Sequence, residues 1–343
     1  MSREAEVSVS SAIYGCAGPE LSADEKTFFR ETCPWGFILF ARNIVSPDQV
    51  LHLTASLREA AGHDAPILID QEGGRVQRLR PPHWRSWPAG RRYGEVYERN
   101  AEKGLRAAYL GARLMAAELR STGITVDCLP VLDVPVPGAH DVIGDRAYAG
   151  EPGAVAALGL AAAEGLMAGG VLPVVKHIPG HGRAGVDSHE KLPVVDASLD
   201  ELARMDFAPF RALRTMPFAM TAHVIYTALD PDNPATTSAA VIRDTIRTRI
   251  GFEGLLMSDD LSMKALRGGL AERTRAALAA GCDLVLHCNG DMAEMEAVAA
   301  AATMLRGESL ARAEAALARH VSPSEPLDTD SALAEFSQFM SLA

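Results

Sequence analysis

The chain has 343 residues, of which 48% are hydrophobic and 22% are charged, a composition typical of a soluble globular protein. Lysines and arginines number 33 against 44 aspartates and glutamates, and the net charge of −11 argues against nucleic acid or an anionic membrane as the main partner. The first residues lack the basic-then-apolar pattern of a signal peptide. The longest apolar region, residues 154–175, contains Glu164 and Pro173 and predicts a helix followed by a strand, not a membrane span.

The five cysteines are an odd number, and no two have the C-x-x-C spacing of a zinc site or an obvious disulfide framework. They lie in apolar surroundings, where cysteine most often behaves as a small buried hydrophobic residue. They are Cys16, Cys33, Cys128, Cys282 and Cys288. Together with the missing signal peptide, they favour a cytoplasmic protein in a reducing compartment.

Short apolar runs alternate along the chain with segments of helical pattern. Each run ends in polar, glycine or proline residues, which is typical of a buried strand followed by a loop. The predicted strands are 12–16, 36–40, 66–70, 125–132, 172–177, 218–224, 254–258 and 283–288. The predicted helices include 47–61, 102–122, 153–168, 198–215, 239–250 and 270–280.

Eight strands separated by helices predict a parallel sheet, and eight is the number that closes into a (β/α)8 TIM barrel. We therefore predict an α/β fold with one catalytic barrel domain over residues 1–321, allowing for irregular first strands. Residues 322–343 are predicted to be a C-terminal tail that either packs on the barrel or frays. A dinucleotide-binding domain is not supported, because no early G-x-G-x-x-G motif precedes a helix.

In a barrel of this kind, the residues that follow each strand share one face. Polar residues follow six of the eight predicted strands, and we expect them to converge on one pocket. They are Asp70 to Arg75, Asp133, Lys176 with His177, His223, Ser258 to Asp260, and Asn289 to Asp291.

The seventh predicted strand ends in two aspartates with different interpretations. Asp259 has the position of a nucleophile or an electrostatic stabiliser at a strand end. Asp260 is at least equally open to a structural role as the N-cap of a following helix. A nucleophilic carboxylate also needs a separate acid to protonate the leaving group.

The best candidate for that acid is His189, which lies two residues after Asp187 on the loop that follows the fifth strand. At this spacing in an extended segment both side chains point the same way, so Asp187 can fix the imidazole tautomer and stabilise its cation. Histidine titrates at about 6.5 when unperturbed, which suits a group that gives and retakes a proton.

The same segment offers H-x3-H and D-x-H spacings that could hold zinc through His177, His181, Asp187 and His189. Pro179 and Gly180 would break any helix that aligned two of these histidines, and Lys176 would repel a cation. We therefore predict no metal and no cofactor, with a metal-dependent hydrolase as an open alternative.

The motifs resemble those of bacterial β-N-acetylglucosaminidases in family 3 of the glycoside hydrolases. The resemblance extends in order from about Ile13 to Gly290. Its segments are 69–79 (IDQEGGRVQRL), 142–147 (VIGDRA), 176–182 (KHIPGHG) with 187–189 (DSH), 220–229 (MTAHVIYTAL) and 251–263 (GFEGLLMSDDLSM). Ile178 departs from the phenylalanine common at its place in the family, which affects only loop packing.

The resemblance implies a retaining exo-hydrolase without a metal, with Asp259 as the nucleophile and His189 with Asp187 as the acid/base pair. The positions that match sugar-binding residues of the family are Asp70, Arg78, Arg146, Lys176 and His177. His181 is expected to shape the loop, whereas Asp133 and His223 are open to either a structural role or a role behind the site.

The resemblance also implies that the enzyme removes terminal, non-reducing β-linked N-acetylglucosamine. The expected substrates are GlcNAc–1,6-anhydro-N-acetylmuramic acid and its peptide-bearing forms, in peptidoglycan recycling. We expect a monomer that binds this small-molecule glycan and neither nucleic acid nor a membrane. A phosphorylase is a close alternative, because a neutral histidine repels phosphate less than a glutamate would. A non-catalytic glycan-binding barrel is a further one.

Overall fold

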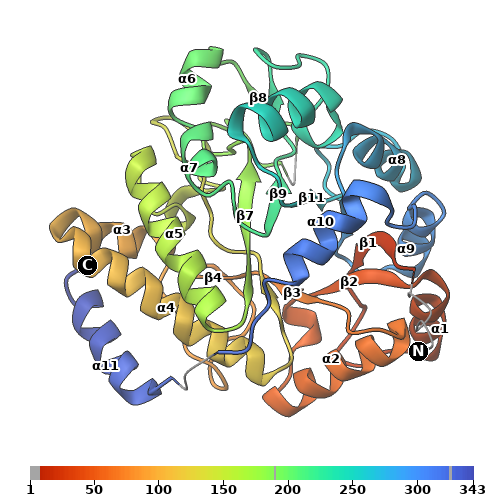
Figure 1. Cartoon of the computed structure of the whole chain (residues 1–343), viewed down its shortest axis with the longest axis horizontal. Helices are drawn as coiled ribbons and strands as arrows, with labels where there is room; N and C mark the ends of the chain where they lie inside the picture. The colour runs from red at the N-terminus through yellow and green to blue at the C-terminus, as the bar shows by residue number, and fades with distance from the viewer. Residues whose placement is uncertain (1–7, 189–190, 324–326) are drawn as a thin grey trace.

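Eight parallel strands form a closed barrel in the computed structural model, which describes residues 8–188, 191–323 and 327–343 (Figure 1). Each of the eight predicted apolar runs contributes one strand, so the (β/α)8 TIM barrel is confirmed. Around the ring the strands are β1 (Ser10–Tyr14), β2 (Pro34–Leu39), β3 (Ile67–Ile69), β6 (Val126–Asp127), β7 (Leu172–Ile178), β9 (Phe218–Thr221), β11 (Leu255–Asp260) and β12 (Leu284–His287).

The register of the barrel shifts at a few places. Between Ser10 and Ile13 the pairing of β1 with β2 is irregular, as the sequence led us to expect for the first strands. The register also shifts between Lys176 and Ile178 in β7, and between Met257 and Asp260 in β11. Such irregularities are common beside active sites, where they redirect a side chain.

Helices cover the outside of the barrel (Figure 1). They are α1 (Ala23–Thr32), α2 (Pro47–Ala61), α3 (Gly90–Arg99), α4 (Ala101–Ser121), α5 (Pro152–Ala168), α6 (Leu199–Arg204), α7 (Phe207–Ala212), the π-helix η4 (Val241–Ile250), α8 (Leu270–Ala280), α9 (Met292–Ala299), α10 (Gly307–Leu317) and α11 (Thr329–Met340). Three short turns are helical as well, namely η1 (Ala41–Asn43), η2 (Gly144–Arg146) and η3 (Ala235–Thr237).

The helix predicted over residues 198–215 is wrong as a single element, because the structure has two short helices there. The first, α6, ends before Met205, and the second, α7, begins at Phe207. Pro209 explains the break. In one continuous helix it would leave the carbonyl of Met205 without its donor, and its ring would clash with that carbonyl. In the first turn of α7 the missing N–H costs nothing.

Two small sheets sit outside the barrel ring, near the carboxyl ends of the strands. One is the antiparallel hairpin of β4 (Gln71–Gly73) and β5 (Val76–Gln77), which directly follows β3. The other pairs β8 (Val194–Val195) with β10 (Ile225–Tyr226) in parallel. The hairpin is flanked by Asp70 and Arg78, two of the predicted sugar-binding residues.

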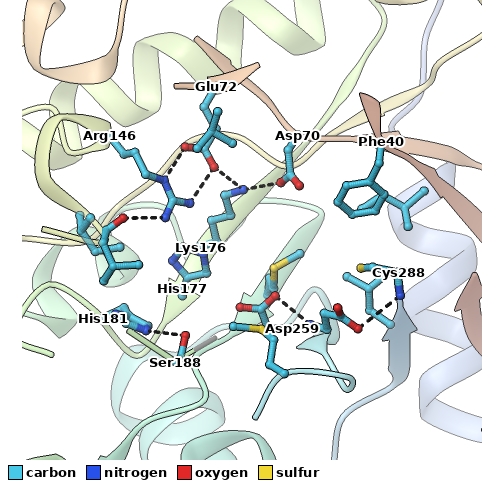
Figure 2. A pocket seen from close by; sticks show the side chains of 18 of the residues that line it. Phe40, Asp70, Glu72, Arg146, Lys176, His177, His181, Ser188, Asp259 and Cys288 are labelled. Atoms are coloured by element: carbon cyan, nitrogen blue, oxygen red, sulfur yellow. Dashed lines mark hydrogen bonds and ion pairs between the residues drawn. The ribbon is translucent and has the colours of Figure 1, made fainter. Parts of the chain in front are cut away.

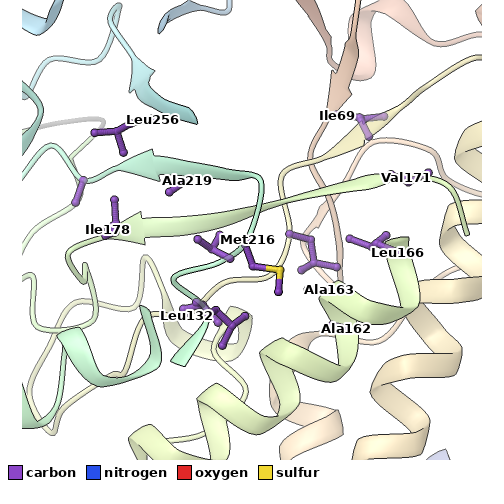
Figure 3. Close-up of a cluster of buried hydrophobic side chains, with 14 of the residues drawn as sticks. Ile69, Leu132, Ala162, Ala163, Leu166, Val171, Ile178, Met216, Ala219 and Leu256 are labelled. Atoms are coloured by element: carbon purple, nitrogen blue, oxygen red, sulfur yellow. The ribbon is translucent and has the colours of Figure 1, made fainter. Parts of the chain in front are cut away.

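The core has two apolar layers, one inside the barrel and one between the barrel and its helices. In β7, Leu172 and Val174 belong to the inner layer, whereas Val175 belongs to the outer one. Figure 3 shows the outer layer where Ala163 and Leu166 of α5 face the strands. Strands buried on both faces produce continuous apolar runs in the sequence, which is why the runs were readable.

The segment predicted as a tail contains α11, which packs against α3 and α4. The Phe336 ring lies 5.6 Å from Trp87 and 6.1 Å from Tyr93, measured between ring centroids. The domain boundary between residues 321 and 322 stays a prediction. In the part of the chain that the structure describes, no helix is both long enough and apolar enough to cross a membrane.

Candidate active site

A pocket of about 290 Å³ opens at the carboxyl ends of the barrel strands. Six of the eight residues predicted for the site line it, namely Asp70, Arg78, Arg146, Lys176, His177 and Asp259. Asp187 is described by the structure but does not line the pocket, and His189 lies outside the described residues. The expectation that residues from several strand ends converge is met for Asp70, Lys176, His177 and Asp259, whereas Asn289 to Asp291 do not line the pocket.

Five charged side chains form a continuous chain along one wall of this pocket, and Figure 2 labels Asp70, Lys176, Glu72 and Arg146 among them. The Nζ atom of Lys176 lies 2.7 Å from Asp70 Oδ1 and 2.6 Å from Glu72 Oε1. Arg78 donates from Nη2 to Asp70 Oδ2 at 2.9 Å. Arg146 donates from both Nε and Nη2 to the carboxylate of Glu72, each at 2.8 Å. Positive and negative groups thus alternate from Arg78 to Arg146.

The local fold places these groups together. Asp70 immediately follows β3, and the turn at Gly73 sends the chain back so that Glu72 and Arg78 lie on one hairpin. Gly73 has a φ of +91°, and a Cβ atom there would lie 2.2 Å from the carbonyl oxygen of Pro88. Only glycine fits this turn, because both the positive φ and the close approach exclude a side chain.

The network keeps its charges at neutral pH. Burial alone would raise the pKa of Glu72, but Arg146 and Lys176 outweigh it and lower this pKa to about 2. The pKa of Asp70 is lowered by the same competition, in which Lys176 and Arg78 oppose burial. Burial would lower the pKa of Lys176, yet Asp70 and Glu72 raise it overall. A fixed set of ionised groups therefore lines the pocket.

Asp133 lies behind the pocket and organises the two histidines that follow β7. Its carboxylate accepts from His177 Nδ1 at 2.7 Å and from the backbone N–H of His181 at 2.6 Å. Despite burial, the neighbouring histidines lower the pKa of Asp133 to about 2. Because Nδ1 is held by Asp133, Nε2 is the ring atom of His177 that remains for a ligand.

His181 contacts the loop, as expected, and it also lines the pocket. Its Nε2 lies 3.2 Å from the hydroxyl of Ser188. Burial and the neighbouring His177 lower the pKa of His181 to about 4, so its ring is neutral at physiological pH. The hydrogen bond to Ser188 therefore joins two uncharged groups.

Asp259 and Asp260 end β11 at the pocket, and their roles differ. Asp259 accepts a hydrogen bond from the backbone N–H of Asp260 at 2.8 Å. Asp260 binds both the backbone N–H and the hydroxyl of Ser262, at 3.0 and 2.6 Å. The interpretation of Asp260 as a helix N-cap is wrong, because α8 begins only at Leu270 and its N-cap is Gly269. Asp260 instead caps the turn that follows the strand.

His223 supports the end of β11 from behind. Its Nε2 donates to the backbone carbonyl of Asp260 at 3.0 Å, and its Nδ1 lies 2.7 Å from the hydroxyl of Thr236. Burial lowers the pKa of His223, which keeps the ring neutral. Of the two roles left open for this residue, the geometry favours the structural one.

Glu72 and Phe40 are among the residues of the pocket that the sequence does not single out. Glu72 belongs to the polar residues at a strand end, and it lies two residues after Asp70, a spacing that places both side chains on one side of an extended segment. Phe40 also lines the pocket, and the guanidinium groups of Arg78 and Arg42 lie 5.0 and 5.1 Å from its ring centroid. No sequence pattern distinguished Phe40 from an ordinary strand residue.

Residues 20–322 of the sequence match the family described as "Glycosyl hydrolase family 3 N terminal domain". The chain belongs to glycoside hydrolase family 3. The family resemblance that the sequence motifs indicated is therefore confirmed, and the charged pocket is the part of this family 3 barrel where the matched motifs meet.

Among its relatives, this family 3 chain is 43% identical over 281 residues to a β-hexosaminidase of Methylococcus capsulatus, covering 81% of this chain and 82% of that protein. It is 39% identical over 277 residues to a β-hexosaminidase of Bordetella avium, covering 80% of this chain and 79% of the relative.

The fold also matches solved structures. NagZ from Neisseria gonorrhoeae in complex with N-trifluoroacetyl-D-glucosamine superposes with a TM-score of 0.88 at 33% identity, covering 97% of this chain and 99% of that one. The same gonococcal protein in complex with a zinc ion gives a TM-score of 0.85 at 32% identity, again covering 97% of this chain and 99% of the other.

Proposed function

We propose that this chain is a retaining β-N-acetylhexosaminidase that removes terminal, non-reducing β-linked N-acetylglucosamine. The observation that carries the proposal is the position of Asp259 in the same pocket as the alternating charges of Asp70, Lys176 and Glu72. Charged hydrogen-bond donors and acceptors at fixed positions suit the hydroxyl groups of one sugar ring. A carboxylate beside such a ring suits attack on its anomeric carbon.

In the proposed reaction, Asp259 attacks the anomeric carbon while His189 protonates the leaving oxygen. The bond between sugar and leaving group breaks, and a covalent glycosyl–Asp259 ester forms. Water, deprotonated by His189, then attacks the same carbon, and the carboxylate leaves. Two displacements at one carbon give net retention of the β configuration. Asp187 serves by orienting His189 and stabilising its cation.

The proposed natural substrates are GlcNAc–1,6-anhydro-N-acetylmuramic acid and its peptide-bearing forms, cleaved in the cytoplasm during peptidoglycan recycling. The β-hexosaminidase relatives and the sugar-bound gonococcal structure support the glycan class. We propose that the protein acts on these substrates as a monomer.

Turnover of an aryl β-N-acetylglucosaminide by the purified protein tests the proposal. Asp259→Asn should lower kcat by a factor on the order of 10⁴ or more, as loss of an essential nucleophile does. Asp244→Asn is the matched control, since Asp244 is an exposed carboxylate on η4 paired with Arg243. A 5-fluoro glycosyl inhibitor should label Asp259. Full activity of Asp259→Asn, or a label on another carboxylate, would overturn the assignment.

The alternatives are separated in the same assay. A phosphorylase would release N-acetylglucosamine 1-phosphate and would require phosphate, whereas a hydrolase releases the free sugar without it. A metal-dependent hydrolase would lose activity with EDTA and regain it with zinc. A non-catalytic glycan-binding barrel would bind N-acetylglucosamine and turn over nothing.

A further inference from the structure

Glu72 has no role in the proposed chemistry, yet it is the most completely engaged carboxylate in the pocket wall. Its side chain is 3% exposed, and its two oxygens accept three contacts from cations. Arg146 binds it with both Nε and Nη2, and the Nζ atom of Lys176 approaches within 2.6 Å. Both oxygens of Glu72 contact these cations, so we trace its effect on the pocket through Lys176 and Arg146.

The charge balance of the wall depends on this residue. Arg78, Lys176 and Arg146 are three cations, and Asp70 and Glu72 are two anions, which leaves one net positive charge. Without Glu72 the same wall would carry two net positive charges, and Arg146 would lose the only carboxylate with which the structure pairs it in the described residues.

That difference bears directly on glycoside cleavage. In the transition state the sugar ring becomes oxocarbenium-like and positively charged. Asp259 on the same pocket stabilises this charge, whereas an uncompensated cation on the wall would oppose it (Figure 2). A neutral ground-state sugar carries no such charge, so it is much less sensitive to the charge of the wall.

We propose that Glu72 is a positioning residue that holds Lys176 and Arg146 in place and cancels one of their charges, so that the pocket tolerates a cationic sugar. The inference rests on the proposed function, because only glycosyl transfer generates a cationic ring at this position. It assigns Glu72 a role that differs from sugar binding by Asp70 and from nucleophilic attack by Asp259.

Glu72→Gln keeps the size of the side chain and removes its charge. The variant should lower kcat by a factor on the order of 10 to 100, the effect of one unit charge several ångströms away at an effective dielectric constant of about 20. The affinity for neutral N-acetylglucosamine should fall only a few-fold, from poorer orientation of Lys176. Affinity for an iminosugar analogue that is protonated on its ring nitrogen should fall in parallel with kcat.

The decisive measurement is the ratio of the dissociation constants for these two ligands, determined by calorimetry. Glu72→Asp keeps the charge, so it should retain the wild-type ratio even if both affinities weaken. The double variant Glu72→Gln with Arg146→Met removes one anion and one cation, and it should restore the ratio towards the wild-type value. This double variant also avoids an unpaired cation, which covers the case in which Glu72→Gln does not fold.

Glu98→Gln is the matched control, because Glu98 accepts from Arg91 Nη1 at 2.8 Å and from Arg91 Nη2 at 3.0 Å away from the pocket. It should leave the ratio unchanged. Equal losses for the neutral and the cationic ligand in Glu72→Gln, or no recovery in the double variant, would overturn the proposal. Absence of turnover and of sugar binding in the wild type would instead overturn the proposed function.

Discussion

The two histidines that follow β7 show how a single neighbour decides the chemistry of a residue. His177 donates to the carboxylate of Asp133, which fixes its tautomer. His181 donates to that carboxylate only from its backbone N–H, and its ring contacts the neutral hydroxyl of Ser188. His181 is therefore held in its neutral form, and this should be visible in the pH dependence of stability.

Because burial and His177 lower the pKa of His181 to about 4, the folded state binds its proton more weakly than the unfolded state does. The contribution of neutral His181 to the free energy of unfolding is fully present above pH 6.5. It is lost as the pH falls from about 6.5 to 4, by up to about 3 kcal/mol. His181→Gln should flatten the pH dependence of the free energy of unfolding over this range, measured in urea at several pH values. The exposed His320→Gln should not. An unchanged slope in His181→Gln would show that His181 does not resist protonation.

At the scale of elements, the sequence predicts the positions of the strands more accurately than it predicts the contacts between side chains. Strands buried on both faces leave continuous apolar runs, and all eight were readable. The helical pattern of residues 198–215 hides the break before α7, which Pro209 explains. The pairing of Glu72 with Arg146 joins residues 74 positions apart. The order of the strands can predict that Glu72 and Arg146 lie on the same face of the barrel. Only the fold of the hairpin and η2 brings the two side chains into contact.

The start of the loop between β7 and β8 is anchored to the two short helices beyond it. Arg183 donates from Nε to Asp206 and from Nη1 to Glu201, each at 2.7 Å. The hydroxyl of Tyr226 donates to the carbonyl of Gly180 at 2.6 Å. These contacts fix the chain a few residues before Asp187, so they set where the proposed acid/base pair begins.

Arg183→Met should therefore lower both stability and kcat. Its loss leaves the buried carboxylate of Asp206 without its cation, and breaking such a pair costs about 3 kcal/mol. The double variant Arg183→Met with Asp206→Asn should recover much of this stability, because no buried charge is left unpaired, but it should not recover kcat. Arg243→Met, which breaks an exposed pair, is the control for urea unfolding. Wild-type kcat in Arg183→Met would show that the anchor does not position the loop.

At the scale of the whole molecule, the C-terminal helix α11 is connected to the pocket through Trp87. The ring of Trp87 packs edge-on against Phe336 of α11. Its backbone carbonyl accepts from Gly74 at 2.8 Å, and its backbone N–H donates to Gln77 at 2.9 Å. Both Gly74 and Gln77 belong to the hairpin region that carries Glu72 and Arg78. The end of the chain thus supports the segment from which the charged wall is built.

Phe336→Ala tests whether α11 belongs to the folded unit or frays from it. Phe336 is buried against two aromatic rings, so its removal should lower the free energy of unfolding by about 3 kcal/mol. A chain that ends at Val321 should lose at least as much, because all of α11 is missing. Gln338→Ala on the exposed face of the same helix is the matched control.

Because the hairpin rests on Trp87, KM for the aryl glycoside should rise in Phe336→Ala as well. Unchanged urea unfolding in both Phe336→Ala and the shortened chain would mean that residues 322–343 are a separable tail.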